Sequence, residues 1–165
     1  MSEFNLEDIQ KDNDKPWSNY VRGVILYLQE MGIAIPGIRM LIAGNVPIGS
    51  GLSSSAAIEM ATGVLIEQLT GNKIDGTKLA LIGQKAENSF VGVNTGILDQ
   101  FVSRMGKKNH AVWLDCRTLE YELLPIDNTL YKVVVCDTMK KRGLVESEYN
   151  TRRKQCEESV EMFSD

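Results

Sequence analysis

A stretch rich in glycine and serine, residues 44–57, lies between an apolar run at 38–43 and a helical pattern at 56–69. A strand, a loop and a helix start in this order are typical of anion sites. Glycines let the backbone approach a ligand, and free N–H groups at the helix start point toward it. Serine hydroxyls there can cap the helix, bond a phosphate or ligate a hard cation. A capped loop without a ligand has the same composition, so both interpretations stay open for this stretch by itself.

Three known loop motifs do not fit this stretch. A Walker loop ends in Gly-Lys-Ser/Thr, and residues 44–50 have its glycine spacing without the lysine. The dinucleotide fingerprint requires a third glycine, but residues 49–51 are followed by Leu-Ser-Ser. A nucleophile elbow requires a glycine two residues after its serine, and Ser53 is followed by two serines. The motif that remains is Pro-x-x-x-Gly-Leu-Ser-Ser-Ser-Ala-Ala, which starts at Pro47.

Two carboxylates could act on a bound anion or its acceptor. Asp99 opens a helical stretch after a glycine-containing loop, where an ionised carboxylate can accept a proton or hold an alcohol. Glu87 lies near the end of the preceding helical pattern. Both also have structural interpretations, since an acid in the first turn complements the helix dipole and Glu87 could pair with Lys85. The one histidine, His110, lies in a polar turn, and nothing in the sequence places an acid to activate a Ser54–His110 pair.

The composition narrows the class of protein. The chain has 165 residues, a net charge of −4 and a pI near 5.1, so it is long enough for one domain and lacks a basic footprint for nucleic acid. Cys116, Cys136 and Cys156 form no Cys-x-x-Cys pair, which argues against a disulfide scaffold or zinc site and suits the cytosol. No apolar run could span a membrane, and the first residues do not resemble a secretory signal. We expect a cytoplasmic protein that binds neither nucleic acid nor membrane.

Segregated helical and strand patterns predict an α+β fold in one domain. Helices are expected at 17–31, at 56–69, from a Thr77 cap to about Glu87, at 97–105 and at 144–163. Strands are expected at 38–44, 111–115, 119–123 and 131–137, the middle two as a hairpin around residues 116–118. Residues 1–15 read as a loose lead-in or a weak helix, and residues 90–96 as a loop. Buried stripes are expected at Val21, Val24, Ile25 and Leu28; at Ala57, Ala61, Val64, Leu65 and Gln68; and at Leu79, Ile82, Gly83 and Ala86.

The loop motif closely resembles the phosphate-binding motif of the GHMP kinases, the superfamily of galactokinase, homoserine kinase, mevalonate kinase and phosphomevalonate kinase. Three further segments are similar to galactokinases in particular: residues 16–23, residues 87–106 with Gly-Ile-Leu-Asp-Gln-Phe, and residues 146–157 with Ser-x-Tyr-Asn-x-Arg-Arg. The resemblance runs from about Trp17 to Glu157. It implies a GHMP-kinase N-terminal-type domain, the ribosomal protein S5 domain 2-like fold, with an unusual left-handed βαβ crossover. Residues 1–165 would form one partial domain. It would contain the phosphate loop at 44–57 and would end in the first long helix after the domain's earlier elements.

For function, the resemblance implies ATP-dependent phosphorylation of a sugar at its anomeric hydroxyl, with ATP and Mg²⁺ as cofactors. Asp99 corresponds to the catalytic aspartate, Gly96, Asp99 and Tyr149 to sugar contacts, and Ser55 and Glu87 to the magnesium ligands. The nucleotide would contact Trp17, Pro47, Gly49, Ser50, Gly51, Leu52, Ser53, Ser54, Ser55 and Ala56. Trp17, with Tyr20, would supply an apolar wall for adenine, although a core aromatic at a helix start is an equal alternative for Trp17. Galactose is the leading sugar, while close relatives handle N-acetylgalactosamine, arabinose and uronic acids.

The chain also departs from the family. Galactokinases begin with a segment containing Gly-Glu-His-x-Asp-Tyr that supplies most sugar contacts, and they have a C-terminal half with a second Gly-rich loop. Neither occurs in these residues, so we expect a central fragment with little or no kinase activity by itself. Its unpaired sheet edge is expected to be covered by a homodimer or by rearranged ends. The alternative is a catalytically silent sugar- and nucleotide-binding regulatory protein; the presence of both Asp99 and Glu87 favours the kinase.

Overall fold

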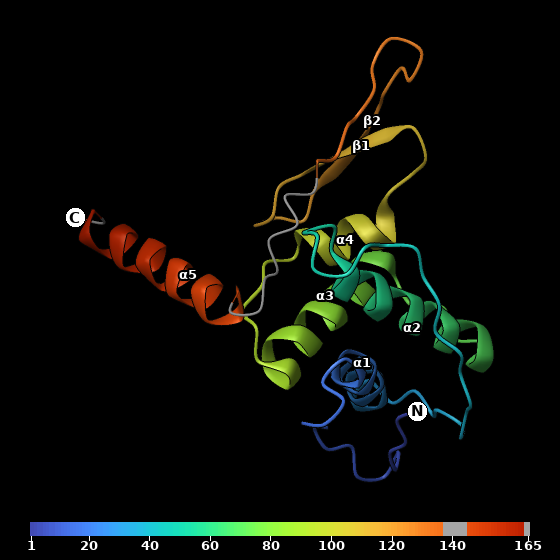
Figure 1. The fold of residues 1–165 in the computed structure, drawn as a ribbon. Helices are drawn as coiled ribbons and strands as arrows, with labels where there is room; N and C mark the ends of the chain where they lie inside the picture. Colours follow the sequence, from blue (N-terminus) through green and yellow to red (C-terminus); the bar gives the residue numbers. More distant parts are fainter. Residues whose placement is uncertain (137–144, 164–165) are drawn as a thin grey trace.

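The computed structural model describes residues 1–136 and 145–163, and the side chains of its last helix from residue 149 onward. In order, its elements are α1 (Ser18–Glu30), α2 (Ser54–Thr70), α3 (Gly76–Lys85), the π-helix η1 (Ala86–Val91), α4 (Leu98–Met105), β1 (His110–Leu114), β2 (Tyr121–Pro125) and α5 (Val145–Met162). The α+β class and all five expected helices are confirmed, with ends shifted by at most two residues. Helices α1 to α4 pack into one body, the hairpin rises from α4, and α5 points away from that body (Figure 1).

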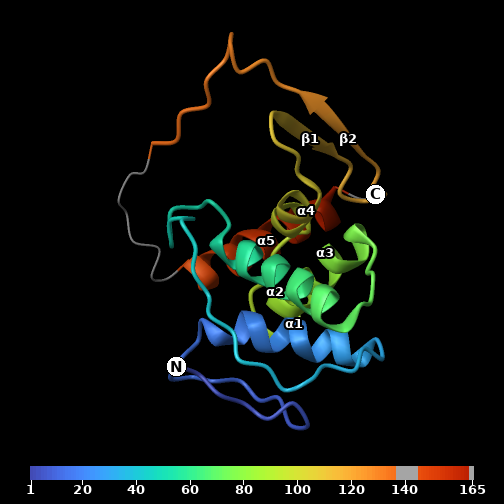
Figure 2. The ribbon, with the colours of Figure 1, turned by 90° about the vertical axis from the view of Figure 1, so that its right-hand side faces the viewer.

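The apolar stripes predicted for α1 and α3 form much of the core. Val24, Leu28 and Leu79 are fully buried, and the other stripe residues of these two helices are buried as well. Residues 1–14 run along the outer side of α1 without forming a helix, as Figure 2 shows below the blue helix. The period of 3.6 residues predicted these two faces because both helices cover the core with small and aliphatic side chains.

The stripe predicted for α2 was wrong. Its buried residues are Ala56, Glu59, Met60, Thr62, Gly63 and Ile66, whereas Ala61 and Gln68 of the predicted stripe are exposed. The cause is the packing of α2 against α1, α3 and α4 at once. Gly63 lets the side chain of Leu79 come very close, and the carboxyl group of Glu59 is turned inward. A prediction from the apolar residues alone leaves Glu59, a charged residue, on the exposed face of α2.

The strand predictions were half right. β1 and β2 form the expected antiparallel hairpin, with His110 opposite Pro125 and Leu114 opposite Tyr121. Residues 38–44 and 131–136 form no strand, and residue 137 lies outside the described part of the chain. A strand requires a partner for its backbone hydrogen bonds, and within the described residues neither segment has one. For the same reason the described strands contain no βαβ crossover.

Two smaller corrections concern the region that carries Glu87. Asp75, and not Thr77, caps α3, because its carboxylate accepts a hydrogen bond of 3.0 Å from the backbone N–H of Lys78. Helix α3 continues into η1 through Val91, where a loop had been expected from residue 90. The backbone carbonyl of Glu87 accepts the N–H groups of Gly92 and Val93, at 2.8 and 3.0 Å. Such wide turns often occur at functional sites, since they re-aim side chains within a helix.

Candidate functional site

The loop before α2 has the backbone expected of an anion cradle. Gly49 and Gly51 have φ values of +77° and +81°, and Ser53 has a φ of +58°. The hydroxyl of Ser50 donates a 2.8 Å hydrogen bond to the carbonyl of Pro47 and closes the turn. The first bond of α2 runs from the N–H of Ala57 to the carbonyl of Ser53, so the N–H groups of residues 54–56 precede the helical ladder. Within the described part of the chain, no side-chain hydrogen bond from Ser53 caps the helix.

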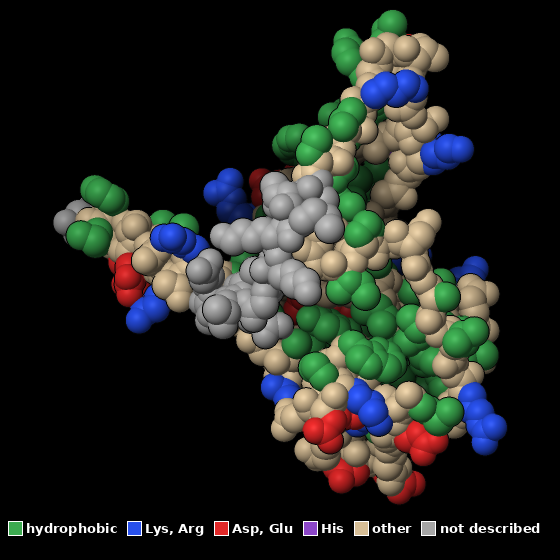
Figure 3. Space-filling view, in the orientation of Figure 1, with side chains coloured by type: hydrophobic (Ala, Val, Ile, Leu, Met, Phe, Trp, Pro, Cys, Tyr) green, Lys and Arg blue, Asp and Glu red, His purple; other side chains and the backbone are tan. Residues whose placement is uncertain are grey.

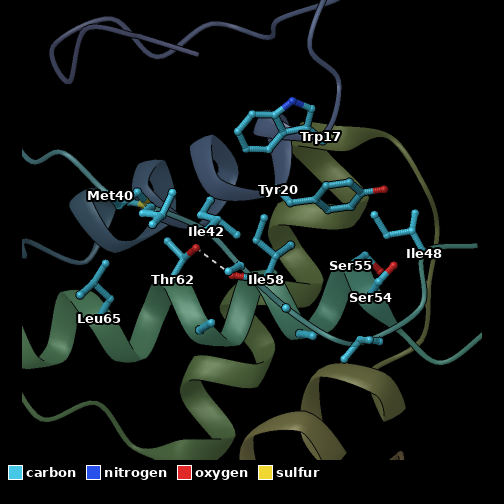
Figure 4. Close-up of a pocket in the computed structure, with 16 residues that line it drawn as sticks. Trp17, Tyr20, Met40, Ile42, Ile48, Ser54, Ser55, Ile58, Thr62 and Leu65 are labelled. Carbon is cyan, nitrogen blue, oxygen red and sulfur yellow. Dashed lines mark hydrogen bonds between the residues drawn. The ribbon is translucent and has the colours of Figure 1, made fainter. Parts of the chain in front are cut away.

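A cavity of about 540 Å³ adjoins this loop. In Figure 4 the rings of Trp17 and Tyr20 lie on one side, and Ser54 and Ser55 at the end of α2 nearest the loop. Met40, Ile42, Ile58 and Leu65 are among the apolar side chains that line the rest of the cavity. Trp17 is 49% exposed, so its ring borders this cavity and is not part of the core. Figure 3 shows hydrophobic side chains gathered where residues 40–48 cross α2. The cavity therefore combines an apolar wall with a polar, backbone-rich end.

Apart from this cavity, Glu87 belongs to a buried group of polar side chains. Its Oε2 atom accepts hydrogen bonds from Nε2 of Gln100 at 2.7 Å and from Oγ1 of Thr95 at 2.8 Å. The same Gln100 nitrogen donates to Oε2 of Glu59 at 3.0 Å. Glu59 is fully buried, and burial, followed by the neighbouring Glu87, raises its pKa to about 9. The bond from Gln100 acts in the opposite direction, and the charge of Asp99 adds to the increase.

Asp99 and Gly96 lie at the surface beside this group. Asp99 is exposed in the first turn of α4, next to Gln100. The preceding loop is tied to α5, because the N–H of Asn94 donates to Oδ1 of Asn150 at 3.0 Å and Arg153 donates to the carbonyl of Asn94 at 3.0 Å. Asn94, Asn150 and Arg153 also line a polar cavity of about 480 Å³. Tyr149, 41% exposed, directly precedes Asn150.

The expected site residues therefore fall into two neighbouring sets. One set, Trp17, Ser54 and Ser55, lines the apolar cavity. The other set, Gly96, Asp99 and Tyr149, does not line the polar cavity but lies close in sequence to Asn94 and Asn150, which do. The bond from Gln100 to Glu59 joins α4 to α2 between them. The other residues expected to contact the nucleotide belong to the loop or the first turn of α2 and do not line the cavity: Pro47, Gly49, Ser50, Gly51, Leu52, Ser53 and Ala56.

The sequence interpretation missed Glu59, Thr95 and Gln100. One signal was available for Glu59: it lies four residues before Gly63 and seven before Ile66, on the stripe that is buried. A charged residue on such a stripe requires a partner inside the protein. Gln100 sits between Asp99 and the buried Phe101, and no local pattern distinguishes its amide from a solvated one.

The chemistry of the donor set fits magnesium. Ser55 offers a hydroxyl oxygen and Glu87 a carboxylate oxygen, both of the kind that this ion prefers. Within the described residues no group of three or more His, Cys, Asp or Glu side chains could hold a metal by itself. Magnesium is usually bound by one or two carboxylates together with substrate phosphates and water. In the same part of the chain, no helix is long and apolar enough to cross a bilayer.

Comparison with known proteins adds two findings. Residues 19–107 match the family described as GHMP kinases N terminal domain. The structure of galactokinase from Lactococcus lactis in complex with galactose is similar, with 38% sequence identity and a TM-score of 0.81. The match covers 98% of this chain and 42% of that galactokinase, so the chain spans less than half the length of its relative. The phosphate loop lies inside the family match, as do Glu87 and Asp99.

Proposed function

Because the chain belongs to the GHMP kinases, we propose that it carries the phosphate loop and catalytic aspartate of a sugar kinase, one that uses ATP and Mg²⁺ to phosphorylate galactose at its anomeric hydroxyl. The observation that carries this proposal is that Ser54 and Ser55 line the same cavity as Trp17 and Tyr20. An aromatic wall suits a purine base, and the N–H-rich start of α2 suits phosphate oxygens. One cavity thus offers both halves of a nucleotide site.

In this proposal each residue has a separate task. The backbone of residues 49–56 and the serine hydroxyls bind the triphosphate, since phosphoryl transfer depends on positioning and charge neutralisation. Ser55 and Glu87 hold magnesium, which supplies positive charge to the phosphate oxygens when bound. Asp99 accepts the proton of the sugar hydroxyl or orients that hydroxyl toward phosphorus. Gly96 lets the sugar approach the backbone, and Tyr149 bonds a ring hydroxyl.

The same proposal includes the sugar substrate and the cellular compartment of the protein. The relative named above was solved with galactose, which supports galactose as the substrate. Cys116, Cys136 and Cys156 are free and exposed, which supports a reducing compartment such as the cytoplasm.

We further propose that two copies associate, because Val133 and Val134 are 82% and 78% exposed in a segment without a strand partner among the described residues.

The test replaces the matching 42% of Lactococcus lactis galactokinase with this chain and measures galactose-1-phosphate formation. We expect the chimera to phosphorylate galactose, and its Asp99→Asn variant to lose activity by at least a thousandfold while still binding ATP. The chain by itself is expected to bind MgATP without turnover. A chimera that folds and binds ATP and galactose but transfers no phosphate would support the catalytically silent binding protein instead.

A further inference from the structure

The buried bridge between α2, η1 and α4 has a feature that packing alone does not explain. One amide nitrogen, Nε2 of Gln100, donates to Glu59 and to Glu87, at 3.0 and 2.7 Å. Gln100 and Glu59 are fully buried, and Glu87 is 4% exposed. Among the residues that the structure describes, Oε1 of Glu59 and Oε1 of Gln100 are buried without a hydrogen-bond partner. Unpaired buried oxygens destabilise a fold, so an arrangement that retains two of them indicates a role beyond stability.

The orientation of the Gln100 amide follows from its neighbours. Turning the amide over would place its oxygen, an acceptor, against two carboxyl oxygens and would remove the N–H donor that Glu59 and Glu87 share. The N–H₂ group therefore faces the two carboxyl groups, one hydrogen toward each. Thr95 adds a second donor to Oε2 of Glu87, at 2.8 Å. With two donors on one oxygen, rotation of the Glu87 carboxylate is restricted, and its other oxygen, Oε1, has a defined direction.

We propose that Gln100 is a positioning residue that holds the Glu87 carboxylate between α2 and α4 and so presents it to Mg²⁺, with Glu59 as the buried anchor of the amide. The inference rests on the proposed function, because it takes Glu87 as a magnesium ligand. It assigns to Gln100 and Glu59 the task that partners of metal ligands commonly perform, which is to orient the ligand and set its basicity. It also links the helix of the phosphate loop directly to the helix that begins beside Asp99.

The first measurement is the affinity of the chain for ATP with and without Mg²⁺, by titration calorimetry. We expect Gln100→Met, which keeps the length of the side chain and removes the amide, to lower the Mg²⁺-dependent gain in ATP affinity by about tenfold or more. Affinity for ATP without Mg²⁺ should stay within about twofold of wild type. The matched control is Gln84→Met, because the amide of Gln84 donates to the carbonyl of Thr95, at 3.2 Å, while the donors to the two carboxyl groups are Gln100 and Thr95.

The second measurement is a double-mutant cycle of urea unfolding on the same chain. The midpoint shifts of Gln100→Met and Glu87→Met should not add, because each variant removes the hydrogen bond between these two side chains. Additive shifts, an unchanged Mg²⁺ gain in Gln100→Met, or an equal loss in Gln84→Met would each overturn the inference. If wild type binds ATP no better with Mg²⁺ than without it, or not at all, the proposed magnesium site fails first and the role of Gln100 toward it fails as a consequence.

Discussion

Glu59 and Glu87 accept hydrogen bonds from the same nitrogen, Nε2 of Gln100, although one carboxyl group comes from α2 and the other from η1. Two buried carboxylates this close cannot both be ionised at low cost. Burial and the charge of Glu87 raise the pKa of Glu59 from 4.5 to about 9, so Glu59 carries a proton at neutral pH.

The first prediction concerns Glu59→Gln and the pH dependence of stability. The folded chain binds one proton more than the unfolded chain between pH 4.5 and about 9. The stability contributed by neutral Glu59 is therefore complete below pH 4.5 and is lost as pH rises toward 9, by up to about 1.4 kcal/mol per pH unit. Glu59→Gln should remove this slope and be more stable than wild type at pH 8.

Urea unfolding at pH 5, 6, 7 and 8 would check this prediction. Glu30→Gln is the control, because its carboxyl group is 52% exposed and pairs with Lys85 at the surface. The control should keep the slope of wild type. If Glu59→Gln keeps it as well, Glu59 is ionised in the folded protein and the assignment of the proton is wrong.

Local patterns predicted the parts of this fold that depend on local chemistry. Glycines and serines at 49–55 predicted a turn before a helix, and the structure has φ above zero at three positions there. The α1 stripe with Leu28 was predicted because its apolar residues recur with the helical period. The buried face of α2 was not predicted, since the partner of the buried Glu59 is Gln100, which lies 41 residues further along the chain.

The strand predictions failed for another physical reason. Residues 38–44 and 131–136 have apolar sequences typical of strands, but a strand exists only with a partner. Sequence composition reports the preference for extended backbone and carries no information on pairing. The site shows the same limit: the resemblance indicated Glu87 and Asp99, while the bridge through Gln100 depends on how α2, η1 and α4 pack.

The second prediction is that Gly83→Ala destabilises the chain. A Cβ at residue 83 would lie 2.5 Å from Cε of Met60 and 3.0 Å from Cγ of Gln100. Alanine has the higher helix propensity, by about 1 kcal/mol, but overpacking at a close helix contact costs about 1–3 kcal/mol. We expect a net loss of about 1 kcal/mol, measured by urea unfolding. Gly37→Ala, whose Cβ would meet nothing within 4 Å, should be neutral; a stabilised Gly83→Ala would mean that α2, α3 and α4 are packed less closely.

The third prediction uses Trp17 as a reporter for nucleotide binding. The chain has two tryptophans, and Trp113 lies away from the cavity in β1. In a Trp113→Phe background, MgATP should change the fluorescence of Trp17, which is half exposed beside the cavity. Trp17→Ala should lower the affinity for MgATP about tenfold, the usual effect of losing an aromatic side chain that stacks on a base. Wild-type affinity in Trp17→Ala would place the base elsewhere.

The fourth prediction is that Arg22 fastens residues 1–14 to α1. Its guanidinium is buried and donates to Ser2, Glu3, Gln10, Asp12 and Ser18, and it stacks 4.6 Å from the ring centre of Phe4. Arg22→Met should reduce the stability of the chain by about 2 kcal/mol and raise hydrogen exchange in residues 1–14. Arg117→Met, at a side chain that is 92% exposed, should change neither. Unchanged exchange in Arg22→Met would show that the segment is held by its apolar contacts.

The fifth prediction tests self-association through the apolar segment at 130–135. Leu130, Tyr131, Val133, Val134 and Val135 are each at least 59% exposed, and their backbone has no strand partner within the described chain. Such a segment is a template for pairing with a second copy, and a lysine within it disfavours that pairing. We expect sedimentation velocity to show a dimer whose fraction rises with concentration and falls in Val134→Lys. Met162→Lys, at an apolar side chain that is 77% exposed on α5, should leave the dimer intact. A compact monomer at every concentration, or equal loss of the dimer in both variants, would contradict association through this segment.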